Sequence, residues 1–128
     1  MTKICFYYCY KKAYAELSSV ISIIILGIGH SIHRHARKNN CTVVPLFLGH
    51  GIGEFLHCPP DIYHCLNNYP GTMREGMVFT VGPVISEGDR RVRVLEDGWT
   101  AITVDNSRTA QVEHTVLITD SGVEILTQ

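Results

Sequence analysis

Two histidines and one glutamate are the residues whose types and spacing best suit metal chemistry in this sequence. His50 lies in the glycine-rich run of residues 49–53, and His57 follows it by seven positions. Glu113 comes much later, in the apolar and β-branched run of residues 110–119. Imidazole nitrogen and carboxylate oxygen are common protein ligands of divalent transition ions. A fold that brings these segments together would form a divalent-metal site.

The order and spacing of these motifs resemble a known enzyme family. The sequence has Gly-His-Gly-Ile-Gly, a second histidine seven residues after the first, and then Glu-His-Thr at residues 113–115. This set resembles the type I methionine aminopeptidases, which belong to the creatinase/aminopeptidase ("pita-bread") metallopeptidases. The resemblance runs from about residue 28 to residue 126. Residues 94–100 and 113–119 are most similar to the mitochondrial branch.

The resemblance implies a role for four residues. His50 would bind one of two divalent ions (Co, Mn, Fe or Zn), and Glu113 would bridge both. His57 would hydrogen-bond the scissile amide and stabilise the charge that develops there, and Trp99 would line the edge of the methionine pocket. The implied substrate is a peptide or the N-terminus of a nascent protein, from which the first methionine is removed.

Each of these residues also has a plainer interpretation. His50 would then be a loop histidine held by backbone hydrogen bonds, and His57 a coincidental surface histidine. Glu113 would lie on a solvated strand face, because Gln111 and Thr115 alternate with it. A lone tryptophan in a β protein, such as Trp99, is often a core residue. The surrounding motifs favour the functional interpretation for His50, His57 and Glu113.

The sequence departs from the family pattern at its metal ligands. Gly82 stands in Thr-Val-Gly-Pro where the family has a glutamate ligand, and glycine has no side chain to ligate. Two aspartates and a histidine that the family places before the helix at residue 28 are also missing, since the first aspartate here is Asp61. The glutamate at position 82 and the two aspartates are three of the five metal ligands that the resemblance implies, and all three are absent. Leu56 replaces an aromatic residue that usually lines the pocket.

These departures favour an impaired metallo-aminopeptidase-type domain, of which only the C-terminal half matches. The alternative is a non-catalytic fragment or pseudoenzyme of the same fold that acts as a binding module. From the sequence alone, Gly82→Glu is expected to raise metal affinity without restoring turnover. A third class, a structural zinc module, would need a closed four-ligand site, and the pairs His57-Cys58 and His64-Cys65 lack a common zinc-finger spacing.

The predicted fold class is α+β, half of a pita-bread fold with two helices packed on a curved antiparallel sheet. Residues 1–27 form a divergent apolar N-terminal segment, and residues 28–128 the C-terminal half of the catalytic domain. The helices are predicted at residues 11–25 and 28–39, and a long loop at the proline- and asparagine-rich residues 58–71. Strands are predicted at residues 42–44, 77–85, 92–95, 99–104, 110–119 and 123–126.

Composition excludes several partners. Eleven basic and twelve acidic residues give a net charge of −1, and no charged block suggests nucleic acid. The apolar run at residues 17–29 is shorter than the ~20 residues that span a bilayer, which makes a membrane partner a poor fit. Five cysteines without a regular framework are predicted to be mostly free thiols in a reducing compartment. The resemblance implies a mitochondrial or cytoplasmic location. Self-association is expected, because a half-fold exposes a sheet edge and an apolar face.

Overall fold

A computed structural model describes residues 24–127, and these residues contain one helix, α2 (Leu26–Lys38). Ile28, Ile32 and Ala36 form its buried stripe at helical spacing. The helix ends at Asn39, and Asn40 follows in the left-handed region at φ 56°, a conformation that asparagine tolerates. The helix predicted at residues 28–39 is thus observed two residues earlier at its start. The helix predicted at residues 11–25 lies almost wholly outside the described residues, so the described part has one helix rather than two.

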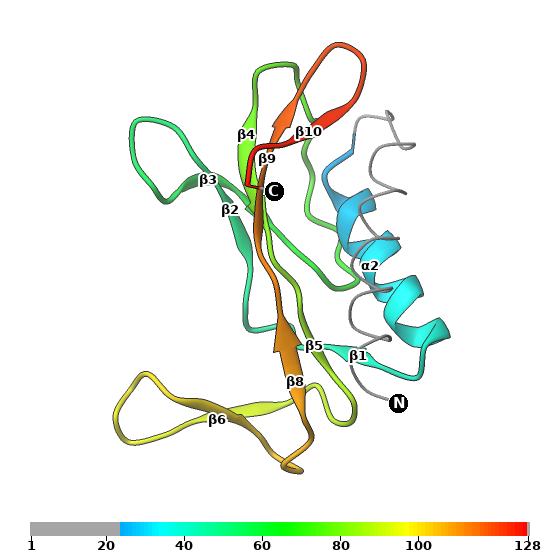
Figure 1. Ribbon diagram of the computed structural model, residues 1–128, viewed down its shortest axis with the longest axis vertical. Helices are drawn as coiled ribbons and strands as arrows, with labels where there is room; N and C mark the ends of the chain where they lie inside the picture. Colours follow the sequence, from blue (N-terminus) through cyan, green and yellow to red (C-terminus); the bar gives the residue numbers. More distant parts are fainter. Residues whose placement is uncertain (1–23, 128) are drawn as a thin grey trace.

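Within residues 24–127 the strands pair only in antiparallel fashion and form three sheets (Figure 1). The five-stranded sheet has the order β10 (Val123–Ile125), β9 (His114–Ile118), β4 (Val78–Val81), β2 (Gly49–Gly51), β3 (Cys58–Ile62). The three-stranded sheet has the order β1 (Thr42–Val43), β5 (Val84–Ser86), β8 (Thr109–Gln111). Strands β6 (Val92–Val94) and β7 (Ala101–Thr103) form a separate hairpin.

Two of the predicted long strands are each interrupted at the same level of the sheet. Residues 78–86 form β4 and β5, and residues 109–118 form β8 and β9. The ladder stops after Val81↔His114 and resumes at Val84↔Gln111, so two residues of each strand lie in the break and the register is unchanged. Pro83 has no N–H to donate to a ladder, which explains part of the interruption. The unchanged register sets Gly82 opposite Glu113.

Strands β2 and β3 were not predicted from the sequence. The glycines of β2 are required by close packing: a Cβ on Gly49 would lie 2.0 Å from the Thr80 carbonyl oxygen, and one on Gly51 would lie 2.3 Å from that of Pro59. Strand β3 occupies the start of the predicted loop at residues 58–71. It contains two prolines and lies at the edge of its sheet, where a missing N–H costs least.

The core lies between α2 and the sheets. Its buried side chains include Ile28 and Ile32 from the helix and Phe79, Val81 and Val116 from β4 and β9. Figure 1 shows α2 against one side of the sheets, while the loop joining β2 to β3 and the β6–β7 hairpin extend from the other side. The candidate site residues therefore lie away from the helix.

Most of the apolar run at residues 17–29 lies outside the described residues. The structure describes residues 24–29 of this run. Ile24 forms a β-bridge with Thr72, and Ile25 and Ile28 are buried in the core. Within residues 24–127, no helix has the length and apolar character needed to cross a membrane. Cys58 and Cys65 are free thiols, as predicted.

Candidate metal and substrate site

The two predicted histidines lie in contact with each other. Strand β2 carries His50, and the following loop returns the exposed side chain of His57, so that the ring centroids are 4.2 Å apart. His50 Nδ1 lies 3.1 Å from the Gly51 carbonyl oxygen, and its backbone N–H donates to Thr80 Oγ1 at 3.1 Å. A carbonyl only accepts hydrogen bonds, so Nδ1 carries the proton and Nε2 keeps a lone pair. This is the tautomer that presents Nε2 as a metal ligand.

Glu113 and Gly82 share one small space across the strand break. A Cβ built on Gly82 would lie 2.6 Å from both Cβ and Cγ of Glu113 and 3.0 Å from its Cδ. The Glu113 side chain therefore lies where a side chain at position 82 would begin. Glu113 is exposed rather than buried, so its charge does not require a metal or an ion pair to offset burial.

A histidine that the sequence analysis did not assign to the site holds the Gly82 backbone. His64 is 1% exposed, and its Nε2 accepts the Gly82 N–H at 3.2 Å. Because Nε2 accepts, Nδ1 carries the proton and donates to the Phe47 carbonyl at 3.3 Å. The Gly82 carbonyl in turn accepts from Gln111 Nε2 at 3.0 Å. Side chains thus satisfy the N–H and the carbonyl of Gly82, which form no hydrogen bond between strands because they lie in the break.

The pKa of His64 is lowered from 6.5 to about 4, chiefly because burial disfavours the charged imidazolium. The Phe47 carbonyl and the negative charge of Glu113 act in the opposite direction but do not offset the burial. His64 is therefore neutral at physiological pH. Protonation at Nε2 would remove the acceptor of the Gly82 N–H.

This lowered pKa predicts a loss of stability in acid. The unfolded chain takes up the His64 proton near pH 6.5 and the folded chain only near pH 4, so the stabilisation is full above pH 6.5. It should decline as the pH falls from 6.5 to 4, by on the order of 3 kcal/mol in all. Urea unfolding at several pH values measures this slope. The His64→Gln variant, which has no imidazole, should lose this part of the slope, and an equal slope in both proteins would contradict the assignment.

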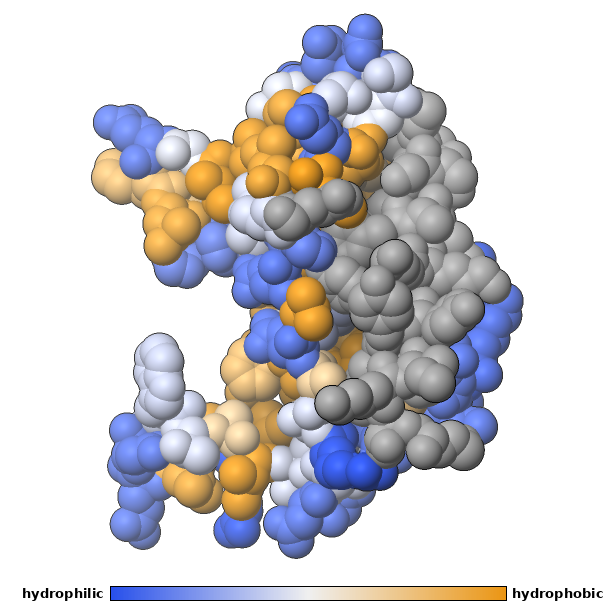
Figure 2. All heavy atoms as spheres, viewed as in Figure 1, coloured by the Kyte–Doolittle hydropathy of each residue, from blue (hydrophilic) through white to orange (hydrophobic). Residues whose placement is uncertain are grey.

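Trp99 and Leu56 are exposed on two separate projections. Trp99 is 91% exposed in the turn between β6 and β7, so the interpretation of Trp99 as a core residue is wrong. Its backbone N–H and that of Thr100 donate to Asp97 Oδ1, which fixes the turn. Leu56 is 67% exposed on the loop between β2 and β3. Figure 2 shows the surface hollowed between these two projections.

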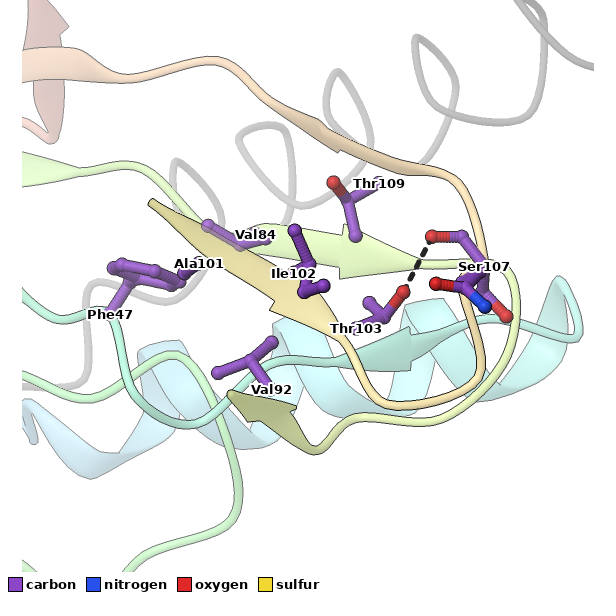
Figure 3. A pocket seen from close by; sticks show the side chains of 9 residues that line it. Phe47, Val84, Val92, Ala101, Ile102, Thr103, Ser107 and Thr109 are labelled. Atoms are coloured by element: carbon purple, nitrogen blue, oxygen red, sulfur yellow. Dashed lines mark hydrogen bonds between the residues drawn. The ribbon is translucent and has the colours of Figure 1, made fainter. Parts of the chain in front are cut away.

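A separate cavity of about 270 Å³ lies beneath the β6–β7 hairpin (Figure 3). Its lining residues are Phe47, Val84, Val92, Ala101, Ile102, Thr103, Asn106, Ser107 and Thr109. The Thr103 hydroxyl, drawn with a dashed line in Figure 3, donates to the Ser107 carbonyl at 2.9 Å. No lining residue is acidic, basic or a histidine, so the cavity has no group suited to acid–base chemistry or to a metal.

The donors of the described residues do not fit the two-ion site that the resemblance implies. Nowhere in residues 24–127 do three or more His, Cys, Asp or Glu side chains gather closely enough to hold a metal ion. Strand β4 lies between the strand of His50 and the segment of Glu113, and Gly82 supplies no donor there. That His50 and Glu113 hold a common ion stays a prediction. His64 is engaged by backbone groups, which also argues against a zinc module with Cys58 and Cys65.

The sequence pattern of metallopeptidase family M24 matches residues 13–120, and the chain therefore belongs to that family. Within the family, the chain is of the type I methionine aminopeptidase kind. Mitochondrial methionine aminopeptidase 1D of Mus musculus is 52% identical over 101 residues, covering 79% of this chain and 30% of the relative. Methionine aminopeptidase 1 of Saccharomyces cerevisiae is 50% identical over 101 residues, covering 78% of this chain and 26% of the relative.

A solved structure shows the same fold. Methionine aminopeptidase from Rickettsia prowazekii superimposes with a TM-score of 0.85 at 39% identity, covering 97% of this chain and 50% of that one. The described sheets and helix thus form part of the pita-bread fold, mostly antiparallel sheet with one helix. The chain spans less than a third of the curated relatives reported above and half of that solved structure.

Proposed function

We propose that this chain is a methionine-aminopeptidase-type domain whose hydrolytic activity is impaired and which keeps the ability to bind a peptide N-terminus. The proposal combines family membership with one departure from the family pattern, the glycine at position 82 in place of a glutamate ligand. Relatives named methionine aminopeptidase support a peptide as the ligand. The name of the mouse relative supports the mitochondrion, and the cytoplasm is the alternative location.

The observation that carries the proposal is the pairing of Gly82 with Glu113. Position 82 is internal to the matched region, so the missing carboxylate does not depend on residues outside that region. The Glu113 side chain takes up the space beside Gly82, and His64 and Gln111 hold the Gly82 backbone. The loss of the ligand is therefore accompanied by a local packing that suits glycine.

The residues proposed to bind the peptide are all accessible. His57 is exposed and, in this proposal, donates a hydrogen bond to the first peptide carbonyl. Trp99 lies exposed on the opposite projection and supplies an apolar contact for a methionine side chain. A divalent ion, when held by a complete family site, would supply an activated water and polarise the carbonyl. His50 and Glu113 are the residues of this chain that we propose would hold such an ion.

Full methionine aminopeptidase activity is the second candidate function. The observation that favours it is the high identity to curated methionine aminopeptidases, together with retention of His50, His57 and Glu113. It requires carboxylate ligands that this sequence lacks at position 82. The two candidates therefore differ in whether methionine is released, and they share the binding of the peptide.

Trp99 provides a direct test of binding because it is the single tryptophan of the chain. Adding a Met-Ala-Ser peptide should change its fluorescence in a saturable way, since burial of an exposed indole shifts its emission. An N-acetylated peptide should give a response at least tenfold weaker, because recognition is proposed to be of the free N-terminus.

His57→Ala should weaken binding of Met-Ala-Ser severalfold, because it removes the proposed donor. His33→Ala is the matched control, since it removes a helical histidine from α2 on the other side of the sheets. An equal response to the free and acetylated peptides, or no response at all, would overturn the binding proposal.

A further inference from the structure

The donors that remain near the site differ in chemistry from those the family implies. The glutamate at position 82 is replaced by glycine, and the Glu113 side chain packs beside that glycine. What the structure does bring together is a pair of imidazole rings, His50 and His57. The resemblance assigns His57 to the substrate rather than to a metal. Among residues 24–127 no third His, Cys, Asp or Glu side chain completes a larger ligand group. The close pair of rings therefore suggests a different use for both histidines.

His50 is prepared to act as a ligand by its hydrogen bond to the backbone. Its Nδ1–H donates to the Gly51 carbonyl, which fixes the ring and leaves the Nε2 lone pair available. Metal-binding histidines usually donate their second nitrogen to a carbonyl or carboxylate in this way. The flanking glycines, packed against neighbouring backbone, hold the strand that carries the ring.

The exposed side chain of His57 lies close enough to His50 to bind the same ion. Its ring lies against the ring of His50 at an interplanar angle of 46°. Two nitrogens bound to one tetrahedral ion lie ~3.3 Å apart, given metal–nitrogen distances of ~2.0–2.1 Å. The ring centroids are 4.2 Å apart, and turning the exposed His57 ring about its own side-chain bonds can bring one of its nitrogens to that separation from His50 Nε2. Solvent water would complete the coordination.

We propose that His50 and His57 bind one late first-row transition ion, with Zn²⁺ as the representative, in a mononuclear site made of two imidazoles. Such ligands favour Ni²⁺, Cu²⁺ and Zn²⁺ over Mn²⁺, which prefers carboxylate, carbonyl and water oxygens. The chain thus differs from its family in the number of ions, the ligands and the preferred metal. This inference does not depend on peptide binding, since the two are measured in separate titrations.

The test is calorimetric titration of the full chain with Zn²⁺ and with Mn²⁺ at pH 7.5 without peptide. Zn²⁺ should bind at least tenfold more tightly than Mn²⁺. His50→Ala and His57→Ala should each weaken Zn²⁺ binding at least tenfold, because a single imidazole is a poor ligand set. His33→Ala is the matched control and should change the affinity by less than twofold.

Nitrogen NMR of the histidine rings provides a readout that does not depend on variants. On addition of Zn²⁺ to the wild-type chain, the Nε2 resonance of His50 and one ring nitrogen of His57 should shift together. Zn²⁺ binding that is unchanged in His57→Ala, Mn²⁺ binding as tight as Zn²⁺ binding, or ring shifts confined to other histidines would each overturn the proposal.

Discussion

Replacing Gly82 with alanine is expected to lower the free energy of unfolding by about 1–3 kcal/mol, the usual cost of overpacking. The new Cβ would lie 2.6 Å from both Cβ and Cγ of Glu113. A change of rotamer can remove Cγ from this contact but not Cβ, so the backbone of the strand break must also shift. Gly82→Glu should be destabilising for the same reason, in contrast to the gain in metal affinity that the sequence alone predicts. Urea unfolding followed by circular dichroism measures both effects.

Two further variants isolate the contact with Glu113. Glu113→Gly should recover part of the stability lost in Gly82→Ala, which a double-mutant cycle would report as a favourable coupling. Gly27→Ala is the matched control, because a Cβ on this helical glycine would meet nothing within 4 Å. It should leave stability unchanged or raise it by up to ~1 kcal/mol. Equal stability of Gly82→Ala and the wild type would contradict the packing described here.

The elements with a clear periodic pattern were predictable from the sequence. The stripe at Ile28, Ile32 and Ala36 predicted α2 to within two residues at its start. The strands bounded by turn residues near 92–95, 99–104 and 123–126 correspond to β6, β7 and β10. Strand β2 was missed because it is only three residues long and two of them are glycines, which have low strand propensity. Contacts of those glycines with β3 and β4 decide its conformation.

The interruption of the long strands shows a second limit of what can be predicted from the sequence. An apolar, β-branched run predicts a strand but says nothing about where its ladder stops. Pro83 gave a local signal for a break in the first strand. No comparable signal marks Glu113, whose position opposite Gly82 follows only from the pairing of the two strands. The most informative contact of the candidate site therefore depends on register, which a single sequence does not specify.

The roles of two other residues depend on the fold as well. His64 follows a proline-rich segment and resembles a loop residue in the sequence, yet it is buried and hydrogen-bonded to Phe47 and Gly82. Its burial depends on segments 17 and 18 residues away along the chain. Trp99 is exposed because the β6–β7 hairpin extends away from the core, which hydrophobicity alone does not indicate.

The chain is expected to release no methionine above the buffer blank from a Met-Ala-Ser peptide in the presence of excess Co²⁺ or Mn²⁺. Hydrolysis by the family requires a water activated by firmly held divalent ions. His50 and Glu113 are two donors where the resemblance implies five, and Gly82 contributes none. His57 can polarise a carbonyl, an effect typically worth ~2.7–4 kcal/mol, but it supplies no nucleophile. Mass spectrometry of the peptide and of free methionine measures the outcome.

The most direct test follows binding and cleavage of the same peptide in one sample. Wild type and His50→Ala are incubated with Met-Ala-Ser and Mn²⁺ while Trp99 fluorescence and peptide mass are recorded together. We predict a saturable fluorescence change in the wild type, with the peptide mass unchanged in both proteins. Release of methionine by the wild type that His50→Ala abolishes would contradict the account and show that this chain forms a working metallopeptidase site.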